Sequence, residues 1–294
     1  MIRWADVRPK LPRIAGYAAF FVGCFVIAAY LTFPWDALRG RVISELERAV
    51  PGYSFDIESL SPSWLTGVEL TNVRARKNTA RASEERVEVL IDELTIRVSP
   101  LAYLLGRTQI RFGGELGDGT LDGAVSVGEE DADVELEFSD LHLKRLALVK
   151  PYIGLPIDGI VNGTVDLHLA QAPKDPKDEN ADTSSGSIDL NIGGITVGDG
   201  RSKLKFGPLQ DGITVETIRA GNLVAKVNIE KGVATIDTFA SKGPDLEFQL
   251  TGDANLALPM SRSRMNLLAR IRFTDGYKNK SDRTKGMFTL LDVA

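Results

Sequence analysis

The hydrophobic positions of this chain follow three successive patterns. Residues 14–33 form an unbroken run of twenty positions without a charge. Residues 34–52 repeat apolar positions at the spacing of a helix, and the residues from Tyr53 onward alternate apolar and polar positions, as half-buried strands do. The chain therefore divides into an apolar helix, a short amphipathic helix and a long β-rich region.

The uncharged run over residues 14–33 predicts a transmembrane helix. At about 1.5 Å of rise per residue it is roughly 30 Å long, the thickness of a bilayer's hydrocarbon core. Four basic residues precede the run: Arg3, Arg8, Lys10 and Arg13. Because basic flanks stay in the cytoplasm, we expect residues 1–13 to be cytoplasmic and the residues after the anchor to lie across the membrane. A cleaved signal peptide is the alternative, although its apolar core is usually about 7–15 residues long.

Residues 34–52 predict a linker helix with one apolar stripe. Asp36 can cap its start, Pro51-Gly52 ends it, and five apolar residues share one side: Leu38, Val42, Ile43, Leu46 and Val50. We expect this stripe to pack against the end of the following sheet. The alternative is that the helix lies on the membrane surface.

The region from Tyr53 to about residue 273 predicts a mainly β fold. Twelve or more alternating runs are separated by short turns such as Gly-Asp-Gly and Glu-Lys-Gly. Short turns between strands favour a long, curved antiparallel meander. Two exceptions, residues 99–106 and 143–154, are patterned as short helices.

A polar insert divides this β-rich region. Residues 171–187 contain two prolines, six charges and no large apolar side chain, which is typical of a solvated loop or linker. The expected organisation is then a first β-rich half at 53–170 and a second at 188–273. Residues 274–294 follow as a polar tail that we expect to be loosely held.

Apolar alternation places many side chains on one face of the predicted sheet. They are Val134, Leu136, Phe138, Ile188, Leu190, Ile192, Leu246, Phe248, Leu250, Leu267, Ala269 and Ile271. Two arrangements bury such a face: a closed sandwich or barrel core, or an open trough that accepts acyl chains. Alternation fits both, and the closed core is the expected form for a chain of this length.

The composition and the motifs of the chain restrict the partners, disulfides and metal sites that it can have. A net charge of −5 argues against nucleic acid as a partner, since phosphates demand a basic face. The only cysteine, Cys24, lies in the apolar run, so no internal disulfide forms. His142 and His168 are the only histidines, and their spacing fits no paired metal ligands, so we interpret both as surface residues. The acidic stretch 129–133 is interpreted as a solvated turn, with Ca²⁺ binding as the alternative.

The sequence also lacks a nucleophile elbow, a phosphate-binding P-loop and a dinucleotide fingerprint. We therefore predict no enzyme activity, no catalytic residue, no cofactor and no resident metal.

Several sequence segments resemble those of a known group of proteins. After the apolar run come LERAVPG, SFDIESL and LSPSWLTGVELTNVRAR, and later GTLDGAVSV and DGIVNGTVDLHL. These look like the AsmA-like group of inner-membrane-anchored periplasmic proteins. Chain length, layout and the closing MNLLARIRF are most similar to the type II secretion system protein N (GspN) family.

The resemblance implies a location and a role. The expected location is the inner membrane of a Gram-negative bacterium, with a single span and a periplasmic C-terminal domain. The expected role is a structural accessory component of the type II secretion system that contacts other subunits of that system and the bilayer. The alternative is a lipid-binding or lipid-transfer protein that holds phospholipid, as the wider AsmA-like group suggests.

Overall fold

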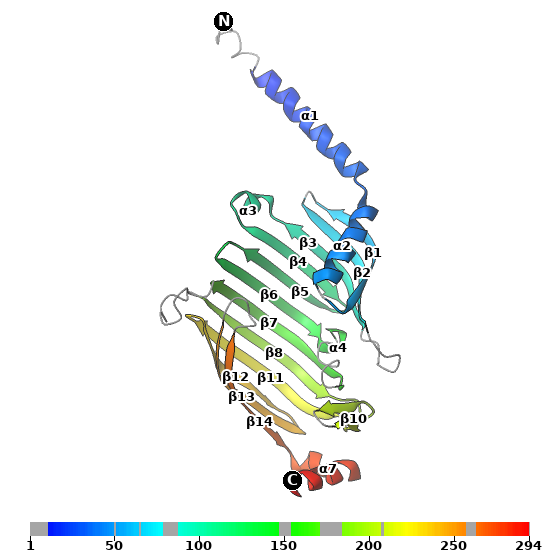
Figure 1. Cartoon of the computed structure of the whole chain (residues 1–294), viewed down its shortest axis with the longest axis vertical. Helices are drawn as coiled ribbons and strands as arrows, with labels where there is room; N and C mark the ends of the chain where they lie inside the picture. The colour runs from blue at the N-terminus through cyan, green and yellow to red at the C-terminus, as the bar shows by residue number, and fades with distance from the viewer. Residues whose placement is uncertain are drawn as a thin grey trace.

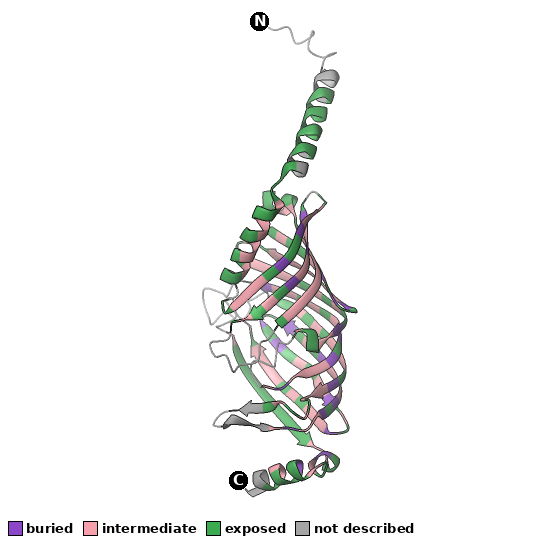
Figure 2. Ribbon diagram, turned by 90° about the vertical axis from the view of Figure 1, so that its right-hand side faces the viewer, coloured by how far each residue is buried: buried purple, intermediate pink, exposed green. Residues whose placement is uncertain are grey.

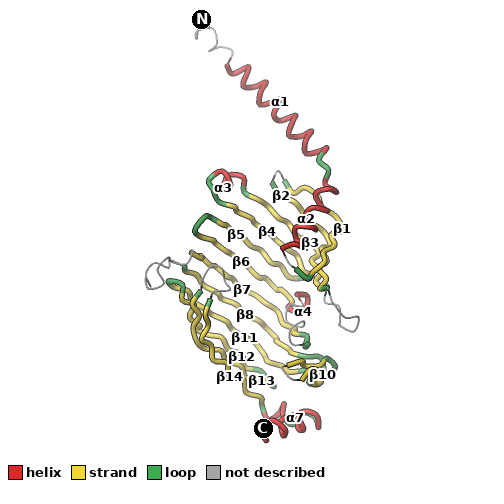
Figure 3. The backbone as a smooth tube through the Cα atoms, in the orientation of Figure 1, coloured by secondary structure: helices red, strands yellow, loops and turns green. Residues whose placement is uncertain are grey.

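The computed structural model describes residues 11–49, 51–64, 66–78, 88–146, 154–170, 184–206, 209–256 and 263–293. Twelve strands form one antiparallel sheet (Figures 1 and 3). These strands are β1 (Tyr53–Ser63), β2 (Gly67–Lys77), β3 (Glu88–Val98), β4 (Thr108–Leu116), β5 (Gly119–Val127), β6 (Asp131–His142), β7 (Ile157–Ala170), β8 (Ser185–Val197), β11 (Ile218–Glu230), β12 (Val233–Lys242), β13 (Leu246–Asn255) and β14 (Arg264–Phe273). A separate hairpin joins β9 (Lys203–Phe206) to β10 (Leu209–Thr214).

The strands follow one another across the sheet in chain order, interrupted only by the β9–β10 hairpin. This order confirms the predicted antiparallel meander. Tight turns make it possible: at the β11–β12 turn, Lys231 and Gly232 have φ values of 50° and 75°. Both values lie in the left-handed region that a two-residue hairpin turn requires.

The sheet is not closed, so the expected sandwich or barrel core is wrong. β1 and β14 are its two edges, and they do not pair with each other. Figure 2 shows the sheet from the side, as a twisted and curved layer with a helix against one face. The error has a physical cause: alternation determines which face of a strand is apolar, but not what covers that face.

The two predicted halves belong to the same sheet. β7 and β8 pair directly, from Ile157 opposite Val197 to His168 opposite Ser185. The polar insert therefore connects neighbouring strands of one layer, and β8 begins before the predicted boundary at 188. Residues 171–183 of the insert lie outside the described residues.

The N-terminal helix α1 (Leu11–Thr32) forms where the sequence predicts a helix and projects away from the sheet (Figure 1). Apolar side chains such as Tyr17, Phe20 and Phe25 are exposed along it. Over the described part of the chain, no helix combines the length and the hydropathy that a membrane span needs.

The predicted linker helix is α2 (Trp35–Ala49), and it packs on the apolar face of the first strands. Its stripe contributes Leu38, Val42, Ile43 and Leu46 to a cluster built around four buried residues: Ile57, Leu60, Leu70 and Val73. Burial of apolar surface contributes about 25 cal/mol per Å², so this contact is the main support for α2.

The described residues contain four further short helices: α3 (Pro100–Leu104), α4 (Leu143–Leu146), α6 (Asp275–Lys278) and α7 (Asp282–Val293). α3 falls within the helix predicted at 99–106. α4 is shorter than the predicted 143–154, of which residues 147–153 lie outside the described residues. The C-terminal segment differs from the expected loose tail, because Tyr277 is fully buried and stacks on Phe273 at 5.5 Å.

Candidate binding surfaces

One face of the sheet is a continuous apolar surface that crosses most of the strands. Strand pairing aligns apolar residues of neighbouring strands in rows across this face, and one such row starts beneath α2 at Leu70 and ends at Phe138. The residues of this row lie opposite one another on successive strands: Leu70, Leu94, Gly114, Leu121 and Phe138. We call this side the apolar face.

The predicted residues of the first and second halves lie together on the apolar face. Leu136 is opposite Val165, which in turn is opposite Ile188. Phe138 is opposite Gly163, which is opposite Leu190. Val134 and Ile192 occupy the neighbouring rows, so the register joins residues from β6 and β8 across β7.

The last two strands continue this surface. Phe248 lies opposite Ile271, and its ring is 5.9 Å from that of Phe239 on β12. Leu246 and Leu250 flank Phe248 on the same side, and Leu267 follows opposite Gly252. All the predicted apolar residues therefore share one face, although they lie on four different strands.

Helices cover this face only in places. α4 contributes Leu143 and Leu146 to a cluster with Leu116, Leu141 and Val161. The C-terminal helices cover the far end, where Tyr277 packs with Leu155, Val215 and Ile218. Val134, Leu136 and Ile188 are half-buried and belong to neither cluster, while Leu267 and Ile271 are exposed. The described helices thus leave a strip of the apolar face without helical cover.

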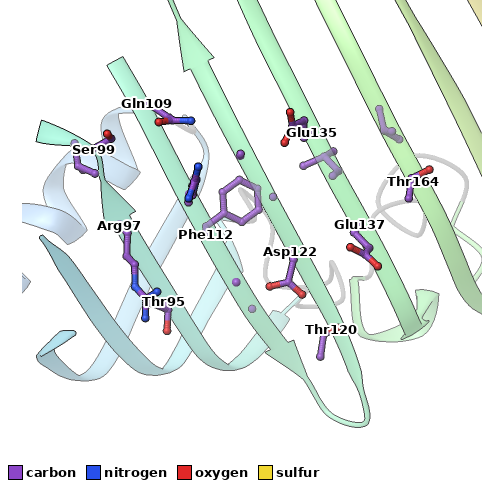
Figure 4. Close-up of a pocket in the computed structure, with 18 of the residues that line it drawn as sticks. Thr95, Arg97, Ser99, Gln109, Phe112, Thr120, Asp122, Glu135, Glu137 and Thr164 are labelled. Carbon is purple, nitrogen blue, oxygen red and sulfur yellow. The ribbon is translucent and has the colours of Figure 1, made fainter. Parts of the chain in front are cut away.

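The opposite face is polar and carries an open groove of about 1200 Å³. Figure 4 shows side chains from neighbouring strands that line it, including Arg97, Asp122, Glu135 and Glu137. Asp122 lies directly opposite Glu137. Like charges facing each other across strands destabilise a sheet, so this arrangement does not serve folding.

Two further acidic pairs repeat the arrangement in this groove: Glu93 opposite Glu115, and Glu135 opposite Asp166. Arg97 lies opposite Arg111 at the other side of the groove. The acidic part suits cations better than anions. Sequence reasoning missed this face, although the polar positions between the predicted apolar residues contain most of it.

A charged cluster sits where β6 begins. Arg107 donates to Asp131 at 2.8 Å and to Asp133 at 2.6 Å, and His168 Nδ1 lies 2.6 Å from Asp133 Oδ1. The hydrogen bond from Arg107 lowers the pKa of Asp131. His168, predicted as a surface residue, thus lies within hydrogen-bond distance of an aspartate that Arg107 also binds.

This cluster is also the one group of described residues whose ligand atoms are close enough for a metal ion. One oxygen each of Asp131 and Asp133 and a ring nitrogen of His168 lie within 4.8 Å of one another. The Arg107 guanidinium already supplies positive charge to both carboxylates, and a divalent cation there would meet its repulsion. Of the acidic stretch 129–133, only its two aspartates take part, and His142 lies apart, 3.9 Å from Asp158.

A second charged cluster fastens the C-terminal helices to the sheet. Asp245 is almost fully buried and accepts from the backbone N–H of Arg219 at 2.9 Å and from its Nε at 3.0 Å. Arg219 holds the pKa of Asp245 below its ordinary value. Tyr277 donates its hydroxyl to the carbonyl of Glu216 at 2.9 Å, and burial raises the pKa of Tyr277 to about 12. These contacts have a structural role, and no sequence motif predicted them.

Comparison of the chain with protein-family profiles, with curated proteins and with solved structures finds no match. The function must therefore be argued from the sequence and from the surfaces described above.

Proposed function

We propose that this protein is a non-catalytic accessory component of the type II secretion system, held at the periplasmic side of a bacterial inner membrane. The observation that carries the proposal is the open sheet: among the described residues, its twelve strands have an apolar face only partly covered by helices and end in an edge strand with one paired neighbour. Such surfaces bind other molecules by packing and by strand pairing, and this binding needs no catalytic group. The sequence resemblance to the GspN family supplies the identity of the machine.

Attachment to the membrane is part of this proposal. It is supported by the twenty uncharged residues 14–33 and by the basic residues that precede them. A second support lies at the end of the sheet from which α1 departs (Figure 1). There α3 exposes Leu101, Tyr103 and Leu104, and the β1–β2 turn exposes Trp64. Tryptophan and tyrosine side chains are enriched at membrane–water interfaces, and leucines form the apolar face of helices that lie there.

Deletion and complementation test the proposal. Without the gene, we expect secreted proteins to accumulate in the periplasm while the phospholipid composition of the membrane stays unchanged. The full chain should restore secretion, and a chain in which a cleavable signal peptide replaces residues 1–33 should not. Normal secretion in the deletion strain would overturn the secretion role, whereas rescue by the signal-peptide version would overturn only the anchor.

A lipid-binding protein is the second candidate, because the uncovered strip of the apolar face suits acyl chains. The test is mass spectrometry of phospholipid that co-purifies with the full chain. Ile188→Glu, on the apolar face, should lower the bound lipid severalfold, since a charge opposes burial of acyl chains. Asn191→Glu, exposed on the polar face of the same strand, is the matched control and should leave bound lipid unchanged. Lipid bound equally by both variants, or by neither the variants nor the native chain, would exclude this candidate.

A further inference from the structure

The two edges of the sheet differ in how their backbone is protected. On β1, side chains of α2 occupy edge groups: Glu47 accepts from the backbone N–H of Phe55 at 3.3 Å, and Arg39 donates to the carbonyl of Glu58 at 2.8 Å. Pro62 lies further along the same strand. Capping side chains and proline are ordinary means of blocking an edge strand from further pairing.

β14 carries no such protection within the described residues. It pairs with β13 through ten consecutive residues, from Arg264 opposite Asn255 to Phe273 opposite Leu246. No described residue bonds to its other side. A regular strand of ten residues whose outer edge is paired with no described residue has the geometry that accepts an added strand.

The side chains of β14 are unusually exposed for a strand of a large sheet. On its apolar face, Met265 is 73% and Ile271 60% exposed, and on the polar face Leu268 is 55% exposed. An edge strand with large apolar side chains exposed on both faces is normally covered in the functional state.

The charged side chains of β14 indicate what kind of segment covers this strand. The polar face of β14 carries Arg264, Arg270 and Arg272, and all three are exposed. The neighbouring strand offers these arginines few acidic partners: Arg272 Nη1 lies 3.9 Å from Glu247 Oε2, too far for a strong ion pair, and Asp253 lies opposite Asn266. An added strand with acidic residues opposite these arginines would therefore gain charge-assisted contacts.

We propose that β14 is a docking edge for an extended partner segment that alternates acidic and apolar residues and adds to the sheet as a thirteenth strand. This inference deepens the proposed function, because it names the kind of subunit segment that the sheet receives. A second copy of this chain fits poorly: two antiparallel β14 strands centred on Leu268 would place Arg264 opposite Arg272, with like charges facing each other.

A synthetic peptide tests the proposal with the full chain in detergent. The sequence of β6 itself has the right alternation, so the probe is a fluorescent peptide of the sequence ADVELEFS, taken from residues 132–139. We expect saturable binding together with slower hydrogen exchange of the β14 amides. A peptide with lysine at its three acidic positions should bind at least about tenfold more weakly, since it faces the arginines with like charge. A peptide N-methylated at alternate residues should not bind, because it lacks the edge hydrogen bonds.

Protein variants complete the test. Arg270→Glu combined with Arg272→Glu should reverse the preference from the acidic to the lysine peptide, and Arg74→Glu on the distant β2 should leave it unchanged. Equal binding of the acidic, lysine and N-methylated peptides, or no binding at about 1 mM peptide, a weak limit for recognition, would overturn the proposal. Dimerisation of the full chain with protection of β14 would overturn it in favour of a second copy. These measurements use purified protein, so they test the docking edge separately from the secretion role. The peptide can fail to bind while secretion still depends on the chain, and it can bind while secretion does not depend on the chain.

Discussion

Asp245 is the residue whose single side chain joins most parts of the C-terminal region. It binds Arg219 on β11, lies 3.6 Å from the Lys280 ammonium, and is itself part of the turn between β12 and β13. Its side chain is only 4% exposed, so little water can replace a lost partner. A buried carboxylate with several donors is stabilising only while it is ionised and fully bonded.

Asp245→Asn should therefore lower the stability of the full chain by about 1–3 kcal/mol at neutral pH. The pKa of Asp245 is lower in the folded than in the unfolded chain, so its contribution is complete above the unfolded pKa and is lost as pH falls through the folded pKa. The variant should consequently lose less stability than the native chain when pH is lowered below about 4, the ordinary range of an aspartate.

Urea unfolding at neutral and acidic pH measures both effects. Asp118→Asn is the control, because Asp118 is exposed in the β4–β5 turn and makes no ion pair among the described residues. An Asp245→Asn variant as stable as the native chain at neutral pH, or with the same acid dependence, would contradict the assignment.

Gly163 is a second residue with a specific structural role, because the neighbouring backbone leaves no room there for a side chain. It lies on β7 at the irregularity in the β6–β7 pairing, with φ at 143°. A Cβ at this position would collide with the backbone oxygen of Asp189 and lie 2.8 Å from Cα of Leu190. Gly163→Ala should destabilise the fold by about 2 kcal/mol or more, through strain and displacement of β8.

Gly286 supplies the matched control. It lies inside α7, and an added Cβ there meets no atom within 4 Å. Gly286→Ala should raise stability by about 0.5–1 kcal/mol through helix propensity. Thermal unfolding of the two variants compares them, and equal effects would show that space at Gly163 is not limiting.

At the scale of elements, α2 protects the β1 edge of the sheet, and weakening its contact should expose that edge to solvent. Val42→Ala with Leu46→Ala shortens its apolar stripe and should loosen its contact with β1. Hydrogen exchange at the amide of Phe55, which Glu47 caps, should then accelerate severalfold while exchange in β6 stays unchanged. Glu45→Ala, which removes only an exposed contact with Arg48, is the control. Unchanged protection of Phe55 in the double variant would mean that α2 does not protect this edge.

Sequence reasoning succeeded for elements whose pattern is local. Period-two alternation found the strands, the stripe Leu38–Val42–Leu46 found α2, and a turn glycine marked the β11–β12 hairpin at Gly232. Each of these signals arises within a few residues, where propensity and burial act together.

The features that sequence reasoning missed depend on register and on distant contacts. Tyr277 is buried against Phe288, eleven positions away in a segment with few apolar residues, and no periodicity marks such a contact. Arg107, which directly precedes β4, meets Asp133 on β6 and His168 on β7 because strand pairing aligns the ends of β4 to β7. Openness of the sheet has the same origin, since it depends on whether the edges meet and not on any single strand.

At the scale of the whole molecule, the sheet should behave as one unit despite the polar insert. β7 and β8 are joined by pairing along almost their full length, and β8 is in turn paired with β11. Apolar rows such as Leu136–Val165–Ile188 cross from the first half to the second, so separation of the halves would expose this surface to water. We therefore expect the pairing of β7 with β8 to hold the halves together even without a covalent link between them.

A protease site inserted between Ala170 and Ser184 tests this unity. After cleavage, the two fragments should co-elute as one particle in native size-exclusion chromatography and should separate only in denaturant. Ile188→Glu in the cleaved protein should promote their separation, because it places a charge in the apolar row at the junction. Asn191→Glu, on the polar face of the same strand, should not. Fragments that separate without denaturant would show that the halves are independent domains, each with its own core, and that the pairing of β7 with β8 does not hold the molecule together.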